Sequence, residues 1–257
     1  MSADATSRLR EAFDDVAPEY DLMVGLIPGY HAQLVASARE FVRSLTDADG
    51  PGTVFDRPLR IVDLGCGSGA STGALVQAFG DAGLRVEIIG VDVSAGMLES
   101  ARRKKWPAGV RFVQGTAEQV ARGEVEGLAP TPDGFDGVFA AYLLRNVPEG
   151  ERDAFLAGLY ARLRPGAPVL LHDYSVAGQP VATAAWTALC WGVIVPLSVA
   201  LTRRPGLFTY LWRSVLEFDS VVQTMARLQR AGYSDVRARG MPGWQSSMVH
   251  MVHGRRS

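Results

Sequence analysis

The sequence predicts a doubly wound α/β fold, in which helices cover both faces of a mostly parallel sheet. Short apolar runs alternate with helix-like segments over residues 59–173, the order produced by parallel strands joined through right-handed crossover helices. A glycine-rich turn follows the first apolar run, and an acidic residue closes the second. Sheets of this kind bind their ligands beyond the carboxyl ends of the strands.

Seven strands are expected. Five apolar or β-branched runs form the core, at residues 59–64, 86–93, 110–114, 135–143 and 169–173. Helical patterns lie between them, at residues 71–79, 95–105 and 149–163. An amphipathic helix at residues 220–231 precedes two closing strands, at residues 233–239 and 247–252. The expected architecture is a Rossmann-like, seven-stranded, mostly parallel sheet.

The 257 residues are interpreted as one domain with two helical segments outside the sheet. Residues 1–50 are expected to form an N-terminal helical lid, with helices at 8–16 and 31–45. Residues 59–173 form the ligand-binding core, and residues 174–218 an apolar helical insert that also acts as a lid. Residues 219–257 supply the C-terminal helix and the closing strands.

Composition excludes several classes of protein. The hydrophobic fraction of 47% and charged fraction of 21% are those of a globular chain. The net charge of −1 leaves no excess of basic residues to neutralise the phosphates of a nucleic acid. Two cysteines, Cys66 and Cys190, cannot form a disulfide framework and suit a reducing compartment. The first residues lack the apolar core of a signal peptide. We therefore expect a cytoplasmic protein, and no metal site is predicted.

The insert carries an unusually long uncharged stretch. Residues 174–202 contain no charged side chain, and residues 184–201 are apolar enough to suggest a transmembrane helix. Pro180, Pro196 and several hydroxyl side chains argue against a span. A lid-forming helical segment over an apolar pocket is favoured, and loose membrane contact through residues 181–201 stays open.

The glycine-rich turn reads Asp63-Leu64-Gly65-Cys66-Gly67-Ser68-Gly69. Glycines there allow a tight turn and a close approach of the backbone to a ligand. The spacing also satisfies the dinucleotide fingerprint. The Asp63 carboxylate would repel a pyrophosphate, but it can hold the ammonium of an amino-acid moiety, directly or through water. Asp92 suits the ribose hydroxyls of either nucleotide. This pair favours S-adenosylmethionine (SAM) over NAD, with helix capping as the alternative role of each aspartate.

At these residues the chain resembles the class I SAM-dependent methyltransferases. The resemblance implies that Gly65 and Gly67 contact the methionine part of SAM and that Met97 lies against the adenine. The family's adenine-edge loop usually carries an aspartate where this chain has Thr116, a weaker acceptor. The expected cofactor-binding residues are Asp63, Gly65, Cys66, Gly67, Gly69, Asp92, Val93, Met97, Thr116, Ala117 and Ala140. Cys66 is interpreted as part of the turn rather than as a nucleophile.

Several further stretches resemble the ubiquinone/menaquinone biosynthesis C-methyltransferase family. They are the opening at residues 13–23, Leu144-Arg145-Asn146-Val147 after the fourth strand, the surroundings of the fifth strand, and the ending at residues 232–250. The resemblance implies methyl transfer from SAM to a carbon of a hydrophobic aromatic or quinol acceptor. The insert then offers apolar side chains for a prenyl tunnel, at Trp186, Leu189, Trp191, Ile194, Leu197 and Leu201.

Transfer to a ring carbon needs a neighbouring phenol to lose its proton. Arg145 can stabilise the phenolate, but it stays protonated and is unsuited to act as a direct base. Asn146 can fix the substrate oxygen or cap the following helix. Tyr20, His31 and Asp173 are the other polar groups expected to reach the pocket. His31 is either a base or a partly exposed helix residue.

The acceptor side departs from the family pattern. Leu143 stands where the family usually has glycine, and Val24-Gly25 and Ala32-Gln33 replace further family residues. A tailoring methyltransferase of secondary metabolism, acting on carbon or oxygen of another apolar ring, is therefore an alternative. Outside that class stand an NAD-linked oxidoreductase and a SAM-binding protein without catalytic activity. The acceptor's identity, the position methylated and a homodimeric state are left open.

Overall fold

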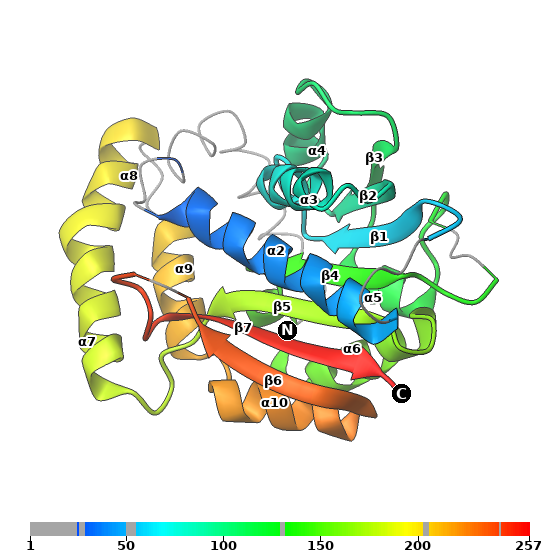
Figure 1. Ribbon diagram of the computed structural model, residues 1–257. Helices are drawn as coiled ribbons and strands as arrows, with labels where there is room; N and C mark the ends of the chain where they lie inside the picture. Colours follow the sequence, from blue (N-terminus) through cyan, green and yellow to red (C-terminus); the bar gives the residue numbers. More distant parts are fainter. Residues whose placement is uncertain (1–24, 26–28, 50–54, 129–131, 203–205, 242) are drawn as a thin grey trace.

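The computed structural model describes residues 25, 29–49, 55–128, 132–202, 206–241 and 243–257. A single sheet of seven strands runs through it in the order β3-β2-β1-β4-β5-β7-β6 (Figure 1). The strands are β1 (Leu59–Leu64), β2 (Val86–Asp92), β3 (Val110–Gln114), β4 (Gly137–Ala141), β5 (Pro168–Tyr174), β6 (Tyr233–Gly240) and β7 (Val249–Arg256). The predicted seven-stranded sheet is confirmed.

The first five strands are parallel, and β7 runs antiparallel to both β5 and β6. The order along the sheet reverses at β1, which lies between β2 and β4. Beyond such a reversal the loops diverge and leave a crevice for a ligand. In Figure 1 the arrows of β1 and β5 point toward the side on which α7 and α9 lie.

Ten described helical segments longer than one turn surround the sheet or extend from it. They are α2 (Tyr30–Asp49), α3 (Ala70–Asp81), α4 (Ala95–Arg102), α5 (Ala117–Arg122), α6 (Arg152–Arg162), α7 (Pro180–Leu189), the π-helical η3 (Cys190–Ile194), α8 (Val195–Thr202), α9 (Gly206–Leu216) and α10 (Val221–Arg230). Short 3-10 turns, η1 (Leu144–Asn146) and η2 (Glu149–Glu151), follow β4.

Helix α2 lies across one face of the sheet and forms a layer of the core (Figure 1). Leu34, Phe41 and Leu45 on its inner face are completely or almost completely buried. Phe41 meets Phe139 of β4 edge to face at 5.7 Å. A Cβ at Gly137 would come within 2.6 Å of the Phe41 ring, so glycine at the start of β4 lets the helix pack this closely. The expected helix at residues 8–16 lies outside the described residues.

The insert after β5 is a run of three helical segments, α7, η3 and α8, followed by α9. Trp186 of α7 is fully buried and packs against Tyr174 at the end of β5, with ring centroids 4.6 Å apart. Ile194 is also buried, whereas Trp191 is half exposed. All three side chains were expected to line a prenyl tunnel. Trp186 and Ile194 instead pack in the core, and Trp191 lies on the surface.

One helical stretch in the described residues, Pro180–Leu197, is long and apolar enough to cross a membrane by length and composition alone. The protein buries 28% of it. A single stretch of this kind is weak evidence for a span.

The structure differs from the sequence prediction mainly around short turns. Strand β4 ends at Ala141 rather than at residue 143, because Tyr142 adopts a left-handed backbone with φ 57°. The helix expected from residue 149 begins at Arg152, after the two 3-10 turns. Helix α5 was not predicted. The feature of the sequence that marks its start is a capping box between Thr116 and Gln119.

Candidate functional site

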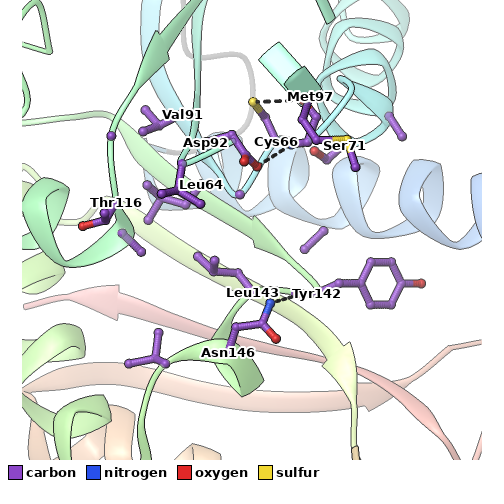
Figure 2. Close-up of a pocket in the computed structure, with 18 of the residues that line it drawn as sticks. Leu64, Cys66, Ser71, Val91, Asp92, Met97, Thr116, Tyr142, Leu143 and Asn146 are labelled. Atoms are coloured by element: carbon purple, nitrogen blue, oxygen red, sulfur yellow. Dashed lines mark hydrogen bonds between the residues drawn. The ribbon is translucent and has the colours of Figure 1, made fainter. Parts of the chain in front are cut away.

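An open pocket lies beyond the carboxyl ends of β1, β2 and β4, where the strand order reverses (Figure 2). It holds about 1160 Å³ of empty space, counting the part open to solvent. Its walls come from the glycine-rich turn, the ends of β2 and β3, the turn after β4 and the start of α2. The lining residues that carry polar chemistry are Ser68, Ser71, Asp92, Thr116, Glu118, Tyr142, Arg145 and Asn146.

The glycine-rich turn has the backbone that its composition predicts. Gly65, Gly67 and Gly69 all have positive φ angles, of 67°, 52° and 94°, which side chains with a Cβ rarely adopt. At Gly67 no described atom lies within 4 Å of the position of a Cβ. Gly65 and Gly67 line the pocket, so this stretch presents bare backbone to a ligand. Gly69 lies against Trp106 instead.

Asp63 lies beneath this turn and not in the pocket wall. Its carboxylate has no solvent exposure and accepts hydrogen bonds from Ser71 Oγ at 2.8 Å and Thr72 Oγ1 at 2.6 Å. Burial raises the pKa of this carboxyl to about 7, against the lowering effect of the two hydroxyls. Asp63 thus holds the first turn of α3 through Oδ2, while its Oδ1 has no hydrogen-bond partner among the described residues. Ser71, one of its two donors, does line the pocket.

Asp92 lines the pocket and braces the turn. Its Oδ2 accepts from the Gly67 amide at 2.8 Å, and its Oδ1 accepts from the Ser94 amide at 2.9 Å (Figure 2). Lys104 donates to the Ser68 carbonyl at 2.8 Å. The two backbone amides hold the Asp92 carboxylate in a fixed orientation at the end of β2, where two adjacent hydroxyls of a ligand can approach it.

The wall formed after β2 and β3 is largely apolar. Val93, Met97 and Ala117 line it together with Glu118, and Met97 is buried. The Thr116 hydroxyl accepts from the Gln119 amide at 3.1 Å to cap α5, while Gln119 accepts from the Thr116 amide at 2.9 Å. The expected role of Thr116 toward an adenine thus competes with a capping role.

Two other predicted cofactor residues have surroundings that define their roles. Cys66 lines the pocket but is almost fully buried, and burial raises the pKa of its thiol well above the usual value. A thiol that stays protonated is a poor nucleophile, in agreement with the structural role inferred from the sequence. Ala140 is packed in the core of the sheet, and its neighbour Ala141 lines the pocket instead.

A buried ion pair forms the opposite end of the pocket. Arg145 Nη1 donates to Asp173 Oδ1 at 2.6 Å, and only 8% of each side chain is exposed. The Arg145 backbone amide donates to the other carboxylate oxygen at 3.3 Å. Arg145 lines the pocket, whereas Asp173 stands behind it at the end of β5. The sequence predicted both residues, and the structure joins them.

Aromatic side chains cover the floor beside this ion pair. Tyr142 stacks with Tyr30 at 5.4 Å and packs against Tyr174 at 5.2 Å, and the Arg145 guanidinium lies 5.7 Å from the Tyr142 ring. The Tyr142 hydroxyl is buried without a hydrogen-bond partner among the described residues. Burial raises the pKa of Tyr142 well above its usual value, so its hydroxyl stays neutral.

The remaining candidates for a base have different environments. His31 is exposed on α2, packs edge to face on Tyr30, and does not line the pocket. Tyr20 lies outside the described residues. His172 of β5 is buried next to Tyr142 and shares a hydrogen bond with Ser37 at 2.7 Å. Burial lowers the pKa of His172 to about 3, so the imidazole is neutral.

Asn146 links this end of the pocket to the insert. Its Nδ2 donates to the Tyr142 carbonyl at 3.4 Å, and its Oδ1 accepts from Tyr210 Oη on α9 at 3.2 Å. Tyr210 was not predicted as a site residue. A lone tyrosine in an apolar helix gives no sequence signal, since the contact spans 64 positions of the chain.

Comparison with known proteins identifies the family. The profile of a methyltransferase domain matches residues 61–166. The ubiquinone/menaquinone biosynthesis C-methyltransferase UbiE of Methylobacterium nodulans is 30% identical over 237 residues, covering 92% of this chain and 86% of that protein. The chain belongs to the class I SAM-dependent methyltransferases. Within them it resembles the quinone-pathway C-methyltransferases.

Two further comparisons concern the family and the fold. A demethylmenaquinone methyltransferase of Lactiplantibacillus plantarum is 28% identical over 231 residues, covering 87% of this chain and 86% of that protein. The solved phosphoethanolamine N-methyltransferase 2 of Haemonchus contortus, in complex with SAM, superposes with a TM-score of 0.60 at 17% identity. The superposition covers 95% of this chain and 57% of the solved chain. At this sequence identity, the comparison supports the fold alone.

SAM is the cofactor of this methyltransferase, and the pocket fits it. Bare backbone at Gly67 leaves room for the methionine part. The oriented Asp92 carboxylate would accept hydrogen bonds from the ribose hydroxyls, and the wall that contains Met97 would offer apolar surface to the adenine ring. The Arg145 end stays available for the methyl acceptor.

Replacing Asp92 by alanine should weaken SAM binding by about 30-fold or more, because it removes both the ribose acceptor and the brace on Gly67. Isothermal titration calorimetry measures this directly. Glu99→Ala, which removes an exposed carboxylate from α4, is the matched control and should bind SAM as the unaltered protein does. Equal affinities of the two variants would contradict the role of Asp92.

Proposed function

We propose that this enzyme transfers the methyl group of SAM to a ring carbon of a hydrophobic quinol, of the kind represented by demethylmenaquinol. The observation that carries the proposal is the buried Arg145–Asp173 pair at the acceptor end of the pocket. The names of the relatives, which are quinone-pathway C-methyltransferases and demethylmenaquinone methyltransferases, support the same acceptor class.

Bound SAM supplies an electrophilic methyl group, which the acceptor carbon takes by in-line displacement. The residues of this chain have to hold the acceptor and favour the phenolate that makes its ring carbon nucleophilic. Arg145 presents a permanent cation to the pocket from a position with little solvent, where its charge is weakly screened. It lowers the pKa of a bound phenol and stabilises the anion as it forms.

Asp173 acts on the substrate only through Arg145. Its Oδ1 accepts from Arg145 Nη1 and from the Tyr174 amide at 2.9 Å, so the carboxylate is fixed by the end of β5. This holds the guanidinium in one orientation. Because Asp173 is engaged behind the pocket wall, we assign it the role of a positioning residue, and the phenol proton leaves to solvent water that enters the open pocket. After transfer, the hydrogen on the methylated ring carbon leaves as a proton to the same solvent, which restores the aromatic ring.

The aromatic floor favours a flat apolar acceptor. Tyr30 and Tyr142 line the pocket next to Arg145 as a stacked pair, with Tyr174 packed against Tyr142 as well. They therefore present apolar surface and ring edges, rather than a free ring face, to an acceptor beside the cation. Leu143 narrows the pocket, since its side chain lies against Gly65 of the cofactor turn (Figure 2). Together these side chains hold a planar ring close to the methyl donor.

Incubation of the purified protein with methyl-labelled SAM and chemically reduced demethylmenaquinol should yield a product labelled on the ring carbon, as determined by mass spectrometry with fragmentation. Label on oxygen would assign O-methylation instead. No transfer, with SAM binding verified by calorimetry in the same preparation, would overturn the quinol acceptor and direct the search to aromatic scaffolds of secondary metabolism.

Replacement of Arg145 by lysine should lower kcat for the acceptor by roughly 100-fold while SAM affinity stays unchanged, because the planar cation no longer meets the phenolate in the same geometry. Removing the charge alone would leave Asp173 buried and unpaired. The second variant is therefore Arg145→Gln combined with Asp173→Asn, which is neutral at both positions. Turnover equal to that of the unaltered enzyme in both variants would exclude the role of Arg145.

We also propose that the enzyme is cytoplasmic and contacts a lipid surface through residues 181–201. Val181, Trp191, Val193 and Val199 are 84%, 50%, 54% and 45% exposed along α7, η3 and α8. No charged residue occurs in residues 174–202. An exposed, uncharged helical segment with a tryptophan suits the interfacial layer of a bilayer, in which a prenylated quinol resides.

Flotation with neutral phosphatidylcholine vesicles should recover the protein with the lipid, and Val193→Asp should abolish the recovery. Val222→Asp is the matched control, because Val222 is 74% exposed on α10, away from the insert. Equal flotation of both variants would contradict the membrane role. If the protein stays at the bottom of the gradient, and elutes from a size-exclusion column as a dimer that Val193→Asp dissociates, the exposed segment at residues 181–201 is a contact between two copies of the chain.

A further inference from the structure

The insert contributes a polar group to the acceptor site. Tyr210 of α9 donates from Oη to Asn146 Oδ1 at 3.2 Å, and Asn146 lines the pocket next to Arg145. Tyr210 is partly buried, and this burial raises the pKa of its hydroxyl above the usual value. The hydroxyl is therefore a neutral donor under physiological conditions.

The orientation of the Asn146 amide follows from its two neighbours. The Tyr142 carbonyl can only accept, so the nitrogen side of the amide faces it, at 3.4 Å (Figure 2). The oxygen side then faces Tyr210, which donates to it. One N–H of Nδ2 is used by the carbonyl, and the described residues offer no acceptor for the other.

The contact to the carbonyl is long for a hydrogen bond, so it holds the amide only weakly. The bond from Tyr210 is also long for an O–H donor, at 3.2 Å, but it engages the oxygen side of the amide and so decides which way the amide faces. Its donor comes from a helix that also contacts α7 and η3. Packing of the insert against the core thus determines the orientation of the Asn146 side-chain amide in the pocket.

We propose that Tyr210 is a positioning residue for methyl transfer, which fixes the amide of Asn146 so that its second N–H meets an oxygen of the acceptor. This inference rests on the proposed function, and it adds a requirement for the substrate class. The acceptor oxygen accepts from two donors, the guanidinium of Arg145 and the amide of Asn146. Phenolates and enolates with an exposed oxygen beside the reacting carbon meet this requirement.

Tyr210→Phe keeps the ring in place and removes only the donor. It should lower kcat/KM for the acceptor by about 5- to 10-fold, the effect of one hydrogen bond, and leave SAM affinity unchanged. Trp212→Phe is the matched control on the same helix, because it removes a bond within the insert, from Trp212 Nε1 to Thr187 Oγ1 at 3.2 Å. This control should retain activity within about 2-fold.

A double-mutant cycle separates positioning from general loosening of the insert. In an Asn146→Ala background, Tyr210→Phe should cause no further loss, because the group through which it acts is absent. A further 5- to 10-fold loss in that background would overturn the proposal. An equal loss in Trp212→Phe would also overturn it, since the effect would then come from the packing of the insert.

A second readout does not depend on the acceptor. In ¹⁵N-labelled protein with SAM bound, the Asn146 side-chain amide signals are assigned by their loss in Asn146→Ala. Tyr210→Phe should shift these signals, and Trp212→Phe should leave them in place. Unshifted signals in Tyr210→Phe would refute the contact, whether or not the unaltered enzyme methylates a quinol. Shifted signals without quinol turnover would keep Tyr210 in its role and reject the quinol acceptor alone.

Discussion

The acceptor end of the pocket depends on the burial of one positive charge. Arg145 is only 8% exposed, and a guanidinium at such a depth is tolerated only with an anionic partner and fixed hydrogen bonds. Asp173 provides both, because the end of β5 holds its carboxylate through the Tyr174 amide. The positions of the neighbouring rings and of η1 follow from this pair, since Tyr142 lies beside the cation and Asn146 follows it in the chain.

The cofactor end is organised in another way, by backbone conformation. Left-handed glycines in the turn after β1 expose peptide groups, and Asp92 on the next strand stabilises the turn through the Gly67 amide. The same carboxylate is the group expected to bind ribose. Asp92 braces the turn, and this role is compatible with the ribose contact expected of it, because a carboxylate oxygen can accept more than one hydrogen bond.

The sequence was sufficient to predict the parallel core. β1 and β3 have the expected bounds. Burial on both faces leaves little choice of residue type in β1, whereas β3 is an edge strand without a buried residue. Arg145, Asp173 and Asn146 were predicted individually. Their mutual contacts were not, since the ion pair spans 28 positions and joins the turn after β4 to the end of β5. Tyr210 and the left-handed Tyr142 depend on tertiary packing, for which the chain has no local pattern.

Asp63 shows a different limit of sequence reasoning. Its position next to the glycines predicted a carboxylate that holds the ligand directly or through water. The structure places this carboxylate behind the pocket wall, where it accepts from the hydroxyls of Ser71 and Thr72. Side-chain alternation in a strand decides which face a residue takes, and the last residues of a strand are the hardest to assign.

The environment of Cys66 has a consequence for the lifetime of the enzyme. A thiolate is among the strongest nucleophiles in a protein, and here a cysteine lies in the same turn that is shaped to hold a reactive alkylating agent. Burial keeps the sulfur protonated, and its Sγ atom packs close to Gly90 of β2. A buried, protonated sulfur is a poor target for alkylation, so this cysteine is held in an unreactive form within the turn that lines the pocket.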